Sequence, residues 1–121
     1  MAEPEKLVIL VTHGPSDPVM ATIPIVMACA GLASDMQVVV GFQGLGVCLM
    51  HEHEADTVEA PGFPPLKQLI ADFLELGGKL LVCNPCAKAY GILDSLRDNT
   101  ELVAAGRLIA EISTAKATLT Y

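Results

Sequence analysis

Short apolar runs recur along the chain, and longer segments with a helical pattern separate them. Residues 6–12 and 36–42 are almost continuously apolar and rich in β-branched side chains. Runs of this kind are typical of strands that are buried on both faces of a parallel sheet. Weaker or shorter runs follow at residues 79–82, 100–104 and 117–121. We therefore expect five strands.

The segments between these runs predict helices. The pattern is clearest in residues 66–76, where apolar side chains recur at spacings of three and four residues and polar side chains lie opposite. We also expect helices at residues 18–33 and 106–115, and a short one beginning near Pro85. Strands that alternate with helices form a parallel sheet covered on both faces. The fold class predicted for residues 1–121 is therefore α/β, a single-domain three-layer α/β/α sandwich with a mainly parallel five-stranded sheet.

The helix expected at residues 18–33 differs from the others because it is apolar on nearly every face. Asp17 and Pro18 suit its N-cap and its first turn. A helix that is apolar all round must be buried all round, so one face would cover the sheet and the other would need a partner. We expect a homo-oligomer in which this helix forms a contact between subunits.

The composition limits the classes of partner. Hydrophobic residues make up 52% of the 121 positions, yet no apolar run approaches the roughly 20 residues of a membrane span. The net charge of −7 argues against nucleic acid and against anionic membrane surfaces. The acidic N-terminus does not resemble a signal peptide, so we expect a cytoplasmic protein. In that compartment the four cysteines indicate free, redox-active or metal-binding thiols rather than a disulfide framework.

Cys83 is the first residue that could carry chemistry. It follows the apolar run at residues 79–82, and Asn84 and Pro85 suit the N-cap and first residue of a helix. The thiol would then lie at the carboxyl end of a strand, where open α/β sheets place their active sites. The start of the helix, with Lys88 nearby, would favour a thiolate. A buried structural cysteine is an equally good interpretation.

Cys86 completes the motif Cys-Asn-Pro-Cys with Cys83. Two sulfurs at this spacing across a helix start can meet, which permits a disulfide, a persulfide resolved by its neighbour, or half of a zinc site. His51 and His53 could supply the other half, although a solvated acidic loop is the interpretation that we favour for them. A second Cys-x-x-Cys, which a zinc ribbon would need, is absent from the sequence.

His13 and Gly14 follow the first expected strand and would lie at the same edge of the sheet as Cys83. A glycine-bearing loop before a helix N-terminus can bind an anion. Asp17 argues against a phosphate in this loop, and we expect it to cap the helix. The segment matches neither a Walker motif nor the dinucleotide-binding glycine pattern.

Several features occur together in the order that a known family shows. The most specific is Val82-Cys83 with Gly91 eight residues after the cysteine, in a strand–helix setting. The others are residues 14–18 after the first strand, the strand before Phe42, Gly46-Val47, Pro65-Leu66, Gly77-Gly78 and residues 117–121. With these features the chain resembles, over nearly its full length, the DsrE/DsrF-like family, which includes the TusD-type sulfur-relay proteins.

The resemblance implies a compact α/β/α sandwich that assembles into trimers or hexamers. In sulfur-relay members one cysteine accepts sulfane sulfur as a persulfide and passes it on, and that cysteine corresponds to Cys83. The implied partners are sulfur-donor and sulfur-acceptor proteins, and thiol exchange of this kind requires no metal and no organic cofactor. Cys86 does not match a position that the relay members generally require.

The predicted function is therefore a small cytoplasmic sulfur carrier or sulfurtransferase. Two alternatives remain open: a dithiol redox or thiol-sensing protein, and a non-enzymatic oligomeric binding module. The predicted catalytic residues are Cys83 and Cys86. The predicted binding residues are His13, Gly14, Asn84 and Lys88.

Overall fold

The sheet is built from five strands that all run in the same direction. The computed structural model describes residues 3–121. In chain order the strands are β1 (Lys6–Val11), β2 (Gln37–Phe42), β3 (Lys79–Cys83), β4 (Thr100–Val103) and β5 (Ala117–Thr120). They lie in the order β4-β3-β2-β1-β5, and each neighbouring pair is parallel. The five expected strands are confirmed, and the sheet is wholly parallel rather than mainly so.

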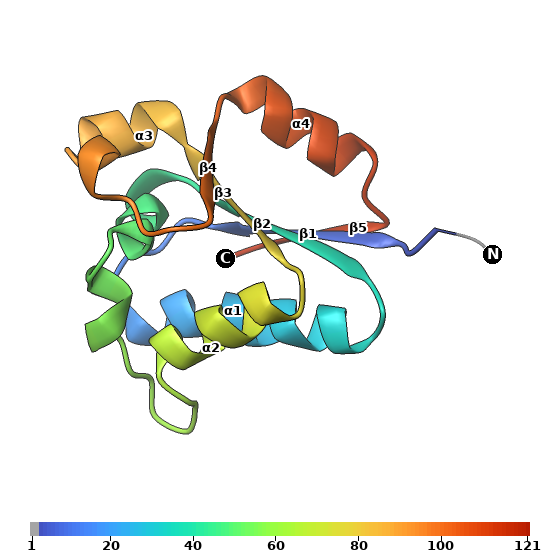
Figure 1. The fold of residues 1–121 in the computed structure, drawn as a ribbon, viewed down its shortest axis with the longest axis horizontal. Coiled ribbons are helices and arrows are strands. Elements are labelled where there is room, and N and C mark those ends of the chain that lie inside the picture. The colour runs from blue at the N-terminus through green and yellow to red at the C-terminus, as the bar shows by residue number, and fades with distance from the viewer. Residues whose placement is uncertain (1–2) are drawn as a thin grey trace.

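Helices cover both faces of this sheet (Figure 1). On one face lie α1 (Pro18–Ala33) and α2 (Leu66–Glu75). On the other face lie α3 (Asn84–Ala89) and α4 (Ala105–Ser113). The described residues also form three short 3-10 helices, η1 (Gly44–Met50), η2 (Glu54–Thr57) and η3 (Leu93–Ser95). The structure thus confirms the single-domain three-layer α/β/α sandwich.

Local chemistry fixes the ends of the two longer helices. The carboxylate of Asp17 caps α1, because it accepts a hydrogen bond from the backbone N–H of Met20 at 3.2 Å. Pro18 is the first helical residue of α1, where no backbone N–H is needed. After α2 the chain reverses at Gly77, whose φ of +94° is one that glycine adopts without strain.

The two faces of the sheet bury unequal amounts of apolar surface. Alternate strand residues such as Ile9, Val40 and Val82 point toward α1 and α2 and join the larger core. The cluster toward α4 contains Val8, Val39, Leu81, Val103 and Leu108. Leu108 is the buried residue of α4, and Ile112 packs beside it partly buried, so this helix rests on the sheet through a small cluster.

The surface of α1 remains apolar where it faces away from the sheet. The helix has no charged residue, and Val19 and Met27 are 41% and 40% exposed. The opposite side of the helix is buried, as expected for a helix that covers the sheet. Among the helices described for residues 3–121, none has both the length and the apolar character that crossing a membrane requires.

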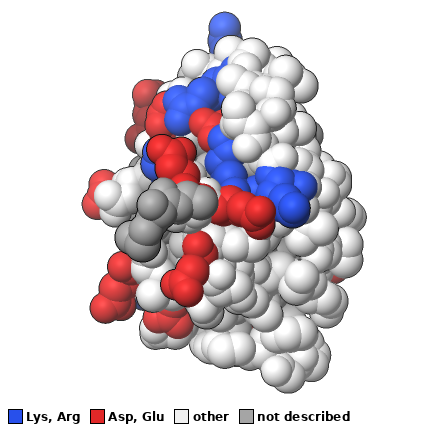
Figure 2. All heavy atoms as spheres, turned by 90° about the vertical axis from the view of Figure 1, so that its right-hand side faces the viewer, with Lys and Arg blue, Asp and Glu red and all other residues white. Residues whose placement is uncertain are grey.

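Charged side chains of both signs form a band on the end of the molecule where the chain begins, beside a wide uncharged area (Figure 2). At this end Glu111 of α4 accepts hydrogen bonds from Arg107 Nε at 2.9 Å and from Lys6 Nζ at 3.0 Å. The hydrogen bond from Arg107, followed in size by the one from Lys6, lowers the pKa of the Glu111 carboxyl. The ion pairs tie α4 to the start of β1.

Gly46 tests how closely η1 packs on β1. A Cβ at this position would clash with the Val11 carbonyl oxygen, which belongs to the backbone and cannot swing away. We expect Gly46→Ala to lower the free energy of unfolding by about 1–3 kcal/mol, as overpacking does. The matched control is Gly106→Ala in α4, where a Cβ meets nothing within 4 Å. The control should leave stability unchanged or raise it by up to about 1 kcal/mol in urea unfolding. Equal losses in both variants would contradict the close contact.

The Glu111 ion pairs predict a pH-dependent stability difference. Because folding lowers the pKa of Glu111, its contribution is fully present above the ordinary carboxyl pKa of about 4.3 and is lost as the pH falls through the folded-state value. Glu111→Gln should therefore cost up to about 1 kcal/mol in urea unfolding at pH 7 and progressively less on acidification. Glu75→Gln, on the exposed surface of α2, serves as control. A Glu111→Gln deficit that is independent of pH would rule out the ion-pair origin.

Candidate functional site

Three neighbouring strands deliver the predicted site residues to one edge of the sheet. β1 leads into Thr12, His13 and Gly14, β2 leads into Gly44 of η1, and β3 ends at Cys83. The order β3-β2-β1 places these three strand ends side by side. The carboxyl ends of parallel strands are where open α/β sheets bind ligands.

Tight backbone packing fixes the loops at this edge. Gly14 is buried against η1, where a Cβ would lie 2.8 Å from the carbonyl oxygen of Leu45. The backbone N–H of Gln43 donates to the Val11 carbonyl at 3.0 Å. The loop after β1 and the loop after β2 therefore form one unit. Gly14 has a packing reason for being glycine, and its predicted binding role stays a prediction.

Cys83 occupies the junction between β3 and α3. It pairs with Val103 of β4 as the last residue of the strand, and it also holds the N-cap position of α3. Asn84 is consequently the first helical residue and not the N-cap, so that expectation was wrong by one position. The physical reason is that β4 pairing keeps Cys83 extended, at φ −63° and ψ 115°, up to the residue where the helix starts. The Cys83 side chain is partly exposed.

The electrostatics of Cys83 differ from those predicted by the sequence. Burial raises the pKa of the Cys83 thiol, and a hydrogen bond with the Cys86 side chain raises it further. The backbone N–H of Cys86 acts in the opposite direction and is the smaller effect. The expected stabilisation of a Cys83 thiolate by the helix start is thus outweighed. α3 has six residues, so few peptide dipoles are aligned to support a charge there.

Cys86 receives a contact that the sequence did not reveal. The backbone N–H of Gly44 donates a hydrogen bond to Cys86 Sγ at 3.3 Å. Gly44 adopts a φ of +54°, a left-handed conformation that favours glycine and turns the chain out of β2 toward α3. The two residues are separated by 42 positions, so only the fold brings them together. The one signal in the sequence is a glycine two residues after an expected strand.

The other predicted binding residues lie at or near this edge. His13 is partly buried, and among the described residues its Nδ1 atom has no hydrogen-bond partner. Lys88 is exposed in the last turn of α3, and burial and Cys86 rather than Lys88 account for the pKa of Cys83. Asn84 is exposed beside Cys83. The binding roles of these residues remain predictions.

The histidines of the acidic segment do not join the cysteines. In residues 3–121 no group of three or more His, Cys, Asp or Glu side chains is arranged to hold a metal ion. The described structure therefore does not bring His51, His53, Cys83 and Cys86 together as the ligands of the zinc site that the sequence allowed. His53 is exposed beside Glu52, with Nε2 at 3.7 Å from a carboxylate oxygen, as the solvated-loop interpretation predicts.

The remaining cysteines have different surroundings. Burial, followed by the charge of Asp72, raises the pKa of Cys29, whose Sγ donates to the Leu69 carbonyl at 3.5 Å. Burial, followed by the charge of Glu54, raises the pKa of Cys48. Neither thiol has a second cysteine as its hydrogen-bond partner in the described part of the chain. Cys83 and Cys86 are thus the thiols that the fold pairs.

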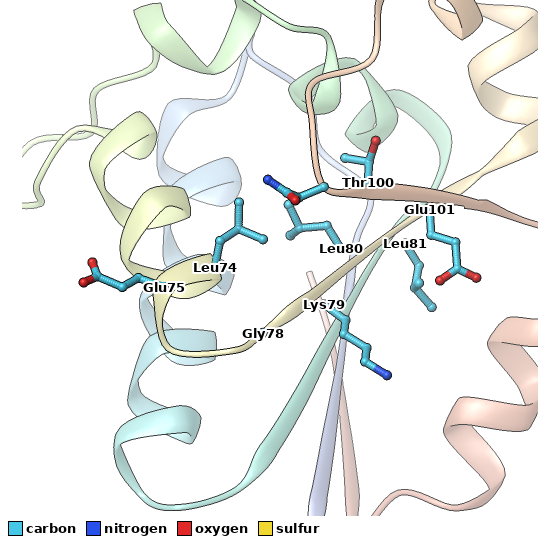
Figure 3. Close-up of a pocket in the computed structure, with 9 residues that line it drawn as sticks. Leu74, Glu75, Gly78, Lys79, Leu80, Leu81, Thr100 and Glu101 are labelled. Carbon is cyan, nitrogen blue, oxygen red and sulfur yellow. The ribbon is translucent and has the colours of Figure 1, made fainter.

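A hollow of about 610 Å³ lies at the other end of β3, away from the cysteines (Figure 3). Leu74 of α2 and Leu80 of β3 point toward one another in it, while Lys79 and Glu101 lie on the side toward α4. None of the predicted site residues lines this hollow. The hollow and the edge that carries Cys83 and Cys86 are therefore separate features.

Comparison of the fold with solved structures finds several similar chains, and three of them are covered almost completely. The ychN protein from E. coli has a TM-score of 0.81 at 17% sequence identity. The match covers 97% of this chain and 99% of the ychN chain. A protein of unknown function from Methanobacterium thermoautotrophicum has a TM-score of 0.74 at 15% identity, with 97% and 99% covered. A conserved protein of unknown function from Bacteroides thetaiotaomicron has a TM-score of 0.70 at 15% identity, with 97% and 95% covered. These likenesses show the fold.

Comparison of sequences identifies the family. An uncharacterized protein of Methanocaldococcus jannaschii is 28% identical over 110 residues, which is 90% of this chain. The chain spans 40% of the length of that relative. The sequence profile of the DsrE/DsrF-like family matches residues 5–121, from the start of β1 to the end of β5 and including the edge with the paired thiols. The chain belongs to the DsrE/DsrF-like family.

Proposed function

We propose that this protein is a sulfur carrier that accepts sulfane sulfur on Cys83 and passes it to an acceptor thiol. The observation that carries the proposal is the position of Cys83. Its partly exposed thiol ends β3 at the sheet edge where the loops after β1 and β2 converge. Membership of a family associated with sulfur relay supports the same conclusion. The finer assignment to the TusD-type relay proteins is part of the proposal.

The chemistry consists of two thiol exchanges. The Cys83 thiolate attacks the outer sulfur of a donor persulfide R–S–SH, so that Cys83–S–SH forms and R–S⁻ leaves. An acceptor thiolate then attacks the outer sulfur of Cys83–S–SH and regenerates the Cys83 thiolate. The rate of each step depends on the fraction of attacking thiolate and on the pKa of the leaving thiol. No metal or organic cofactor takes part in either step.

The proposed partners are proteins that carry the donor and the acceptor sulfur. Cys83 lies beside exposed residues of α3, and α3 projects at the edge of the molecule (Figure 1). A partner thiol can therefore approach without prior opening of the core. His13, Asn84 and Lys88 are the residues that we assign to contact with the incoming partner. Gly14 supports them by allowing the loop after β1 to pack closely on Leu45.

We further propose that the protein forms a homo-oligomer, a trimer or a hexamer, through α1 and the β5 edge of the sheet. The exposed face of α1 has no charge, and the strand at β5 has the uncharged sequence Ala-Thr-Leu-Thr. The outer edge of β5 offers backbone N–H and C=O groups for pairing. Because each chain carries a net charge of −7, two copies associate best through a surface without charge.

Cys83→Ser tests the sulfur-carrier role. After incubation with a persulfide donor and desalting, intact-mass spectrometry should show the addition of one sulfur atom to the wild-type chain and to Cys48→Ser, but not to Cys83→Ser. Because the pKa of Cys83 is raised, its thiolate fraction is small at neutral pH and grows about tenfold per pH unit. The loading rate should rise accordingly from pH 6 to pH 8. Equal labelling of Cys83→Ser and wild type would refute the role.

Met27→Glu tests the proposed oligomer contact. A carboxylate on the exposed face of α1 would have to be desolvated against a second copy, so the variant should shift toward the monomer mass in light scattering at equal concentration. Leu102→Glu is the matched control, since Leu102 is 40% exposed on β4 at the other edge of the sheet. A wild-type chain that is monomeric at the same concentration, or an oligomer that Met27→Glu leaves intact, would contradict the contact.

A further inference from the structure

We propose that Cys86 is the resolving thiol of this site: it attacks the inner sulfur of the Cys83 persulfide, releases hydrosulfide and leaves a Cys83–Cys86 disulfide. The inference rests on the proposed function, because it needs a persulfide on Cys83. It adds a second fate for the bound sulfur. An external acceptor takes the outer sulfur as sulfane sulfur, whereas Cys86 discharges it in reduced form.

The first observation is the position of the two thiols at the start of α3. Cys83 ends β3 at the N-cap position, and Cys86 lies three residues later in the first turn of the helix. Side chains at these two positions face one another across a helix start. Besides burial, the Cys86 side chain contributes to the raised pKa of the Cys83 thiol, as a close neighbour does. The fold therefore holds the two thiols near one another before any persulfide forms. Attack within one chain gains from this proximity over attack by a separate thiol.

The second observation is the hydrogen bond from the Gly44 N–H to Cys86 Sγ at 3.3 Å. A fixed backbone donor stabilises a sulfur that carries negative charge more than a neutral one. Cys86 Sγ thus has a fixed donor from outside its own helix, the Gly44 amide. We therefore assign Cys86 as the attacking sulfur and Cys83, which carries the persulfide, as the attacked one.

The step balances without an added oxidant or reductant. Cys86–S⁻ forms a bond to Cys83 Sγ, and the bond between Cys83 Sγ and the outer sulfur breaks. The outer sulfur takes the electron pair and leaves as HS⁻. The two cysteine sulfurs are oxidised to a disulfide and the sulfane sulfur is reduced to hydrosulfide. Two equivalents of an external thiol then reduce the disulfide and restore both cysteines, with formation of the corresponding external disulfide.

The experiment compares the wild-type chain with Cys86→Ser. Each protein is loaded with inorganic polysulfide, freed of excess reagent on a desalting column and incubated without acceptor. The wild type should release hydrosulfide while Cys83 and Cys86 become joined in the peptide map. Cys86→Ser should keep the sulfur on Cys83 at least about tenfold longer. The matched control Cys48→Ser should behave like the wild type.

Two readouts separate this step from unspecific decay. Release that occurs within one chain is first order, so its rate should not change when the wild-type protein is diluted tenfold. The disulfide formed should equal the hydrosulfide released, and this measurement on the wild type does not depend on the stability of any variant. Equal persistence of the persulfide in wild type and Cys86→Ser would overturn the inference, as would release at a rate proportional to protein concentration.

The outcomes also separate this inference from the proposed function. A persulfide that forms on Cys83 in both proteins, with no faster loss in the wild type, overturns the resolving role and leaves the carrier role standing. A persulfide that forms on neither protein overturns both. A persulfide found on Cys86 instead of Cys83 reverses the assigned roles and therefore also refutes the inference.

Discussion

Parallel pairing of β1, β2 and β3 is the constraint on which the rest of the structure depends. Because the three strands run the same way, their last residues all reach one edge, and every connection must return across a face of the sheet. The returning helices bury the apolar strand residues. The same geometry leaves Gly14, Gly44 and Cys83 as neighbours, although long stretches of sequence separate them. The buried core and the edge that carries Cys83 thus both result from the parallel arrangement of the strands.

Much of this arrangement could be predicted from the sequence because it follows from local patterns. Runs of β-branched residues, the amphipathic spacing in α2 and the cap at Asp17 are short-range signals, and the structure confirms them. The N-cap of α3 was placed one residue too late, at Asn84. Preference for Asn as a cap is a local tendency, and the pairing of Cys83 with β4, a long-range contact, overrode it.

The site was predictable in position but not in electrostatics. The end of an apolar run before Asn84 and Pro85 was enough to place Cys83 at the sheet edge. The direction in which the pKa of the Cys83 thiol shifts depends on how deeply the fold buries the thiol and on how close Cys86 lies. The amide of Gly44 belongs to another strand connection, and no spacing in the sequence relates it to Cys86. Properties that depend on backbone atoms far away in the sequence can be determined only from the folded structure.

The unequal burial on the two faces of the sheet has a consequence for how the molecule opens. α4 inserts Leu108 into a small cluster, whereas α1 and α2 cover the larger core. We therefore expect the region from α4 through β5 to open more readily than the helices over the larger core, in a partial unfolding event that leaves β1, β2 and β3 folded. Such an opening would uncover the outer edge of β1, whereas Cys83 and Cys86 pack against the larger core. We therefore expect the two thiols to stay in place when this region opens.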